Sequence, residues 1–185
     1  MALTFDCGAS GTPTPAILEA LRQAEVRVTF FITGQWATTN PDLTRQIAAE
    51  HEIANHSWSH RDFSQLSDQE IRTEMERTEA AIAYVAGVST KPFWRAPFGS
   101  RNARILSAVR EAGWPYHIYW SADSRDWLAI PASQVRTNVI RAAGNGAIIV
   151  QHCGSVQTAT VLPDILRDLA NMSLRVVTLS ELLRD

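Results

Sequence analysis

The sequence has few cysteines, little net charge and no long apolar run. Two cysteines are too few for a disulfide-rich scaffold, although they suffice for one bridge. The 17 basic and 19 acidic residues are scattered and give a net charge of -2, so no basic stripe for a phosphate backbone is indicated. No apolar run is long enough to cross a bilayer. We therefore expect neither a nucleic-acid partner nor insertion into a membrane.

The first residues also lack the charged start and apolar segment of a signal peptide. The chain begins directly in a predicted strand, which is typical of a domain trimmed at its N-terminus. A length of 185 residues is enough for one well-buried core and short for two. We therefore expect a single domain over residues 1–185.

Short apolar runs alternate with helix-like segments along the whole chain. Strands are predicted at 3–5, 26–32, 52–55, 92–94, 116–120, 147–150 and 174–177. Helices are predicted at 13–22, from 40 onward, and at 67–85, 102–112, 131–143, 161–169 and 180–183. Six or seven strands that alternate with helices favour the α/β class, with a parallel sheet covered by helices.

Several polar residues follow directly after these predicted strands. They are Asp6, His56, His60, Arg95, Asp126 and His152. In a β/α barrel the carboxyl ends of the strands form the rim that holds the active site, so these side chains would converge there. An open doubly wound sheet would gather the same loops, but it usually has a glycine-rich nucleotide loop, and the sequence has none.

The spacing of His56 and His60 is compatible with a metal site. Imidazole is the commonest protein ligand for zinc and also suits other divalent metals. Two histidines four residues apart can converge on one ion. By itself, however, this spacing is weak evidence.

Five segments resemble, in order, the motifs of the polysaccharide deacetylases of carbohydrate esterase family four. They are Thr4-Phe5-Asp6, His56-Ser57-Trp58-Ser59-His60, Arg95-Ala96-Pro97-Phe98-Gly99, Asp123-Ser124-Arg125-Asp126-Trp127 and Val150-Gln151-His152. The resemblance continues to Leu183 and implies a distorted, partly open (β/α)7 barrel similar to a TIM barrel. It also implies metal-dependent removal of acetyl groups from N-acetylated glycans, such as peptidoglycan or chitin-type polymers and oligomers, with release of acetate.

The resemblance implies an acid–base pair. Asp6 would be the general base that takes a proton from the attacking water, and His152 the general acid for the departing amine. Arg95 would pair with Asp6 and keep it ionised, while Asp126 would orient His152 and raise its pKa.

The other motif residues would bind substrate and metal. The backbone N–H of Phe98 would help to hold the oxyanion. Trp58 and Trp127 would offer flat apolar surfaces to a sugar ring. His56 and His60 would ligate a divalent metal, most simply Zn²⁺, with Co²⁺ or a similar ion as the alternative. No motif surrounds the two remaining histidines, at positions 51 and 117.

Cys7 departs from the family pattern. Most members have a second Asp at this position, which completes a metal triad with two histidines. Cys7 could be a thiolate ligand, or it could pack as a small hydrophobe while an oxygen ligand completes the site. A disulfide with Cys153 is the third alternative, and it ranks below the other two because the sequence cannot show that its geometry is met.

Two other functions stay open beside the deacetylase. One is hydrolysis of another C–N bond, in a small amide or cyclic imide. The other is a carbohydrate-binding pseudoenzyme with impaired metal binding, although a binder needs neither Asp6 nor His152. The expected partner is an N-acetylated carbohydrate, and the protein is expected to be a monomer. Its native precursor is expected to be secreted or in the cell envelope, while a cytoplasmic location stays open.

Overall fold

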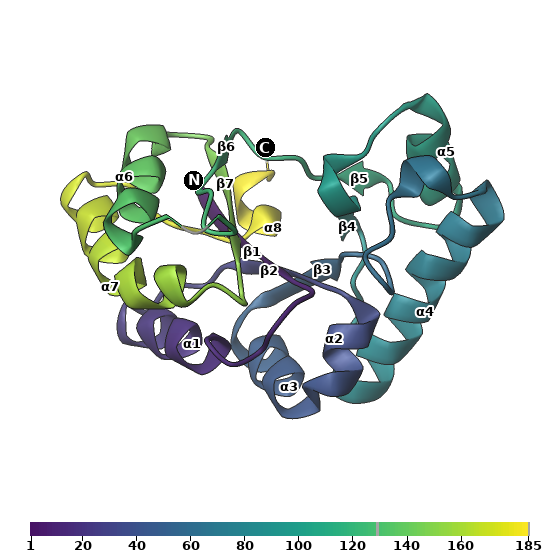
Figure 1. The fold of residues 1–185 in the computed structure, drawn as a ribbon, viewed down its shortest axis with the longest axis horizontal. Helices are drawn as coiled ribbons and strands as arrows, with labels where there is room; N and C mark the ends of the chain where they lie inside the picture. The colour runs from purple at the N-terminus through teal and green to yellow at the C-terminus, as the bar shows by residue number, and fades with distance from the viewer. Residues whose placement is uncertain (129, 185) are drawn as a thin grey trace. The chain divides into compact units, whose positions relative to one another are not determined.

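A seven-stranded parallel sheet forms the centre of the fold (Figure 1). The computed structural model describes residues 1–128 and 130–184. The strands are β1 (Ala2–Cys7), β2 (Thr29–Ile32), β3 (Glu52–Asn55), β4 (Phe93–Trp94), β5 (Tyr116–His117), β6 (Ala122–Asp123) and β7 (Ile148–His152). Their order is β5-β4-β3-β2-β1-β7-β6, a linear order as in a barrel that is not closed. The predicted α/β class, a distorted and partly open (β/α)7 barrel, is confirmed.

Helices follow most of the strands. They are α1 (Thr14–Gln23), α2 (Gly34–Thr39), α3 (Pro41–Glu50), α4 (Asp68–Ala86), α5 (Ala103–Glu111), α6 (Ala132–Ala142), α7 (Val156–Asn171) and α8 (Leu179–Leu182). Two short 3₁₀ turns, Phe63–Gln65 and Pro97–Gly99, lie in loops. Local capping explains two helix starts: Ser67 and Glu70 form the predicted capping box of α4, and Ser155 accepts a hydrogen bond from the Thr158 N–H at the start of α7.

Three predicted strands differ from the structure. The run predicted at 26–32 is a strand only over Thr29–Ile32. The run at 174–177 is not a strand, and it is fixed to the chain start by two hydrogen bonds: Met1 N to Arg175 O (3.0 Å) and Val177 N to Met1 O (3.0 Å). The run at 116–120 ends as a strand at residue 117. The seventh strand is instead the two-residue β6, because Ala122 and Asp123 pair with β7. So short a strand has no hydrophobic pattern of its own from which it could be predicted.

The chain forms two compact units, and the first comprises Met1–Phe30, Glu50–Glu52 and Trp120–Asp185. Every residue of β1 is buried, and Phe5 stacks on Phe30 with ring centroids 5.1 Å apart. Helix α7 packs against both α1 and α6, and the three lie side by side in Figure 1. Strand β1 and its neighbour β7 thus lie in a largely buried part of this unit.

The second unit comprises Phe31–Ala49 and Ile53–Tyr119. Its core joins α4, α5 and β4 through a cluster of apolar side chains: Phe63, Leu66, Ile71, Met75, Trp94, Ala96, Ile105, Ala108, Val109 and Trp114. Helix α4 also packs against α2. The indole N–H of Trp114 donates to the hydroxyl of Thr90 (2.9 Å), so this buried ring has a polar partner.

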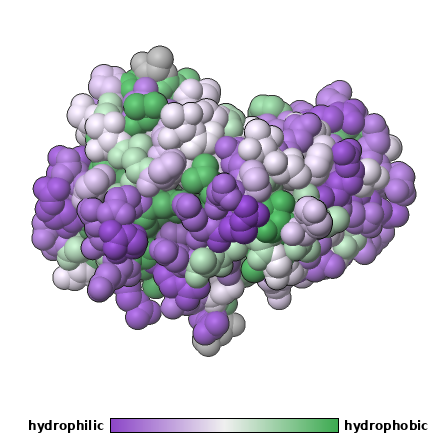
Figure 2. Space-filling model, turned by 90° about the horizontal axis from the view of Figure 1, so that it is seen from below, coloured by the Kyte–Doolittle hydropathy of each residue, from purple (hydrophilic) through white to green (hydrophobic). Residues whose placement is uncertain are grey.

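On the face shown in Figure 2, hydrophilic residues cover most of the area, with smaller hydrophobic areas between them. Within the described ranges, no helix combines the length and the apolar composition that a membrane span requires.

Candidate functional site

Asp6 and His152 lie in neighbouring strands of the first unit. Strands β1 and β7 are parallel, and their register places Asp6 opposite His152. Residues opposite each other in a parallel pair project to the same face of the sheet, and both lie near the carboxyl ends of their strands. The fold therefore brings the predicted base and the predicted acid together on one edge of this unit.

A buried carboxylate holds the ring of His152 in place. The Nδ1–H of His152 donates to Oδ1 of Asp126 (2.7 Å), and its backbone N–H donates to Oδ2 (2.8 Å). The hydroxyl of Thr158, on α7, donates to the same carboxylate. The side chain of Asp126 has no exposed surface, whereas that of His152 is one-third exposed. This arrangement assigns the Nδ1 proton to the bond with Asp126 and leaves Nε2 to exchange a proton with a reacting group.

The pKa of His152 is raised above the usual histidine value. Burial by itself lowers this pKa, but the hydrogen bond to Asp126 raises it, as do the negative charges of Asp126, Asp6 and Asp123. The acidic neighbours outweigh the burial. His152 is therefore protonated over more of the neutral range than an ordinary histidine, as a general acid requires.

An NMR titration of His152 is expected to give a pKa above about 6.5. In Asp126→Asn the pKa should fall, because the hydrogen-bonded anion is replaced by a neutral amide. Asp123→Asn is the matched control and should lower the pKa less, because Asp123 acts through charge alone. Equal pKa values in the wild type and Asp126→Asn would show that Asp126 does not set the protonation of His152.

Cys7 and Cys153 form a disulfide. They directly follow Asp6 and His152, the last paired residues of β1 and β7, so the register that aligns the acid and the base also aligns the two cysteines. Their Cα atoms are 5.0 Å apart, within the usual range for a bridge. Cys7 is thus not a thiolate, and the preference for a free or metal-ligating Cys7 is wrong, because only the strand register reveals how close Cys153 lies.

The histidine pair lies in the second unit, just after β3. His56 is buried, and its Nδ1–H donates to the backbone carbonyl of Arg95 (3.0 Å). This bond leaves the lone pair on Nε2, the arrangement usual for metal-ligating histidines. The rings of His56 and His60 meet edge to face, with centroids 4.9 Å apart.

His56 and His60 could each offer one ring nitrogen to a metal ion. A tetrahedral site needs four ligands, of which a catalytic site leaves one to solvent or substrate. Across residues 1–128 and 130–184, no group of three or more His, Cys, Asp or Glu side chains is placed to hold an ion. Two imidazole nitrogens suit zinc, and they would be two of the three protein ligands that a catalytic zinc site usually has.

Arg95 and Phe98 lie beside this pair in the second unit. Arg95 is completely buried and donates from Nε to the carbonyl of Ile118 (3.1 Å). Its guanidinium lies 4.0 Å from the ring centroid of Phe31. Phe98 has φ 56° and is 71% exposed, with its ring against His60 at 4.8 Å. The pairing of Arg95 with the base and the oxyanion role of Phe98 stay predictions.

The two predicted sugar platforms differ in their surroundings. Trp127 is 61% exposed, and its indole N–H donates to Asp123 (3.1 Å), so one edge is fixed while most of the ring stays open. The ring of Trp58 is covered by the guanidinium of Arg77, at 4.2 Å. Trp127 is therefore better placed to meet a sugar face, and Trp58 is packed within its own unit.

Of the two histidines outside the motifs, His51 is buried and His117 is half-buried, and a lowered pKa favours the neutral form of both. Burial, and then the charge of Arg27, lowers the pKa of His51 to about 4. Burial, followed by the charges of Arg95 and Arg101, lowers the pKa of His117 to about 4. Neither histidine is therefore suited to act as a general acid near neutral pH.

Two supporting residues were not predicted from the sequence. Thr158 hydrogen-bonds Asp126, and nothing in its local sequence indicates this. Glu74 hydrogen-bonds the loop between His56 and His60. A signal for Glu74 was available, because a carboxylate on the apolar stripe of α4 must have polar partners.

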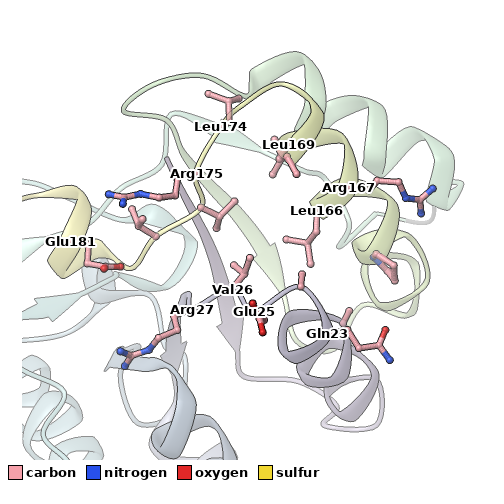
Figure 3. Close-up of a pocket in the computed structure, with 16 residues that line it drawn as sticks. Gln23, Glu25, Val26, Arg27, Leu166, Arg167, Leu169, Leu174, Arg175 and Glu181 are labelled. Carbon is pink, nitrogen blue, oxygen red and sulfur yellow. The ribbon is translucent and has the colours of Figure 1, made fainter.

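A cavity of about 730 Å³ lies elsewhere in the first unit (Figure 3). It is lined by the end of α1, by α7, and by the segment 174–177, with Arg27, Arg175 and Glu181 among its charged residues. None of the predicted site residues lines it. The cavity is thus separate from the acid–base pair of this unit.

Residues 1–117 match the family model described as "Polysaccharide deacetylase". The chain is 33% identical over 189 residues to a peptidoglycan-N-acetylglucosamine deacetylase of Bacillus cereus, covering 100% of this chain and 88% of that protein. It is also 33% identical to the peptidoglycan-N-acetylglucosamine deacetylase PgdA of Listeria monocytogenes, with 98% of this chain covered but only 38% of that protein's length. A chitooligosaccharide deacetylase of Bradyrhizobium is 34% identical, with coverages of 82% and 69%.

The chain is also similar in fold to solved structures of this family. A family 4 carbohydrate esterase from Streptomyces lividans, in complex with acetate, has a TM-score of 0.87 and 37% identity over 95% of this chain and 90% of that one. A CE4 family pseudoenzyme from Bacillus anthracis has a TM-score of 0.93 and 26% identity over 99% of this chain and 64% of that one. A mutant of this pseudoenzyme, described as having restored enzymatic activity, has a TM-score of 0.93 and 27% identity over 99% and 66%.

Proposed function

The chain belongs to the polysaccharide deacetylase family, and we propose from this premise that it removes acetyl groups from N-acetylated glycans and releases acetate. Relatives named as peptidoglycan and chitooligosaccharide deacetylases support a substrate built from N-acetylglucosamine. The observation that carries the proposal is the acid–base pair: His152 lies opposite Asp6 in the sheet and is hydrogen-bonded to a buried carboxylate.

The residues of this pair account for the proton transfers of amide hydrolysis. The Asp6 carboxylate takes a proton from water as the water oxygen bonds to the acetyl carbon. Nε2–H of His152 then gives a proton to the amide nitrogen, so that the C–N bond breaks and a neutral amine departs. Asp126 holds the ring through Nδ1 and stabilises the cationic form of His152.

His56 and His60 are the residues that would hold the divalent metal on which this family generally depends. Such an ion would polarise the acetyl carbonyl and lower the pKa of water. Zinc suits two imidazole nitrogens best, and cobalt is the natural substitute. The proposal assigns the histidine pair and the acid–base pair to one reaction, as the order of the family motifs implies.

Purified protein incubated with zinc or cobalt is expected to bind about one equivalent of metal. His60→Ala should lose most of this binding, because a single imidazole remains. His152→Ala should retain it, because His152 acts on protons and not on the metal. Elemental analysis after dialysis measures all three proteins, and a wild type that neither ion can load would contradict the metal-dependent mechanism.

A glycan-binding pseudoenzyme is the second candidate function. Two observations favour it: the disulfide occupies the position of the family's usual second Asp, and one similar structure is a CE4 family pseudoenzyme. The retained acid–base pair favours the enzyme instead, because a binding protein has no use for it. The secreted or cell-envelope location and the monomeric state stay predictions, and light scattering on the purified protein tests the second.

A further inference from the structure

The loop that carries the histidine pair has an unfavourable backbone conformation. Ser57 has φ 68° and His60 has φ 59°, both in the left-handed region that residues other than glycine rarely adopt. Two such residues within four positions persist only when surrounding contacts fix them. The separation of the two imidazoles therefore depends on what holds this loop.

Glu74 of α4 accepts three hydrogen bonds from the loop. Its Oε2 accepts hydrogen bonds from the backbone N–H groups of Trp58 (2.9 Å) and Ser59 (2.8 Å). Its Oε1 accepts a third from the hydroxyl of Ser59 (2.7 Å). One carboxylate thus binds the loop midway between His56 and His60.

The surroundings of Glu74 show that this is its main interaction. The residue is only 7% exposed, and it forms no ion pair within the part of the chain that the structure describes. A buried carboxylate without a cation is costly unless it accepts several hydrogen bonds. Since all three side-chain bonds come from the loop, the helix and the loop depend on each other.

Contacts from residues within the loop and from Gly34 add to its support. Oδ1 of Asn55 accepts from the Ser57 N–H (3.0 Å), and the Ser57 hydroxyl accepts from the His60 N–H (3.1 Å). The ring of Trp58 packs so closely on Gly34 that a Cβ there would lie 2.2 Å from Cε3 of the indole. The loop is therefore fixed at both ends and in the middle, where the Glu74 carboxylate accepts three hydrogen bonds and the Arg77 guanidinium covers the Trp58 ring.

We propose that Glu74 is a positioning residue for metal binding, which sets the conformation of the loop between His56 and His60 so that both imidazoles can bind one ion. The inference rests on the proposed function of the histidine pair. It adds a residue that does not touch the metal and acts through the backbone of Trp58 and Ser59.

The test compares Glu74→Gln with wild type in a zinc competition titration against a chromophoric chelator. Glutamine keeps the size of the side chain but loses its charge and places an NH₂ donor against N–H donors. Zinc affinity is expected to fall about 10- to 100-fold. The matched control is Glu76→Gln, an exposed residue of the same helix, which should bind zinc like the wild type.

A second measurement separates loop positioning from metal binding. Amide hydrogen exchange of Ser57 and His60 in the metal-free, folded protein should be faster in Glu74→Gln than in Glu76→Gln. Ser59→Ala, which removes only one of the three hydrogen bonds, is the milder variant in case Glu74→Gln does not fold, and it should weaken zinc binding about 2- to 10-fold.

Equal zinc affinity of wild type and Glu74→Gln would overturn the role of Glu74 and leave the proposed function intact. A wild type that binds no zinc or cobalt would instead contradict the metal-dependent function. In that case unchanged amide exchange in Glu74→Gln and Ser59→Ala overturns the positioning role, and faster exchange at Ser57 and His60 supports its structural basis.

Discussion

Replacing His152 with alanine is expected to lower kcat for acetate release by about 10²- to 10⁴-fold. The amine that leaves during amide hydrolysis is a poor leaving group unless it is protonated, and His152 is the group placed to supply that proton. Its raised pKa favours the charged form, and its bond to Asp126 orients the ring before the substrate arrives. Initial rates on a chitooligosaccharide, measured with saturating zinc, give the comparison.

Two controls show whether His152→Ala loses activity because the proton donor is missing and not because the protein has lost its metal or its fold. His152→Ala should retain one equivalent of zinc and unfold in the same temperature range as the wild type, because the Asp126 carboxylate keeps its hydrogen bonds from the backbone N–H of residue 152 and from Thr158. Asp6→Asn should give a similarly large loss of activity, because it removes the base. Wild-type rates in either variant would show that the acid–base assignment is incorrect.

Loss of the Cys7–Cys153 disulfide is expected to lower the free energy of unfolding by about 4–5 kcal/mol. The two residues are 146 positions apart, so the bridge closes a very long loop and strongly restricts the unfolded chain. The bridge also lies directly beyond Asp6 and His152, and its loss should loosen the ends of β1 and β7 that position them.

Denaturant unfolding of wild type and of the double variant Cys7→Ala/Cys153→Ala measures this effect. Wild type treated with a reductant should unfold at the same denaturant concentration as the double variant. The double variant itself should not respond to the reductant, which makes it the internal control. Identical unfolding curves for oxidised and reduced wild type would show that the bridge does not stabilise the protein.

The sequence predicted most of the fold because its signals are local. The Ser67–Glu70 capping box sets the start of α4, and the buried apolar runs mark β1, β3 and β7. The run at 174–177 has the same apolar pattern, yet it makes only two hydrogen bonds with the chain start. Whether an apolar segment becomes a strand depends on a partner strand, which a local pattern does not reveal.

The sequence predicted the chemical groups of the candidate site, but it did not predict the residues that hold those groups in place. Motif order identified Asp6, His152 and the histidine pair. The disulfide depends on the register of β1 with β7, which aligns residues 146 positions apart. The role of Glu74 depends on a loop with left-handed Ser57 and His60, and the local sequence does not show which carboxylate will support that loop.

The most direct test of the proposed function is acetate release by the zinc-loaded wild-type protein from chitooligosaccharides and from peptidoglycan. We predict release from at least one of these substrates, which stops when a chelator removes the metal and returns when zinc or cobalt is added back. A protein that holds one equivalent of metal, has its disulfide intact and releases no acetate from either substrate would contradict the deacetylase function.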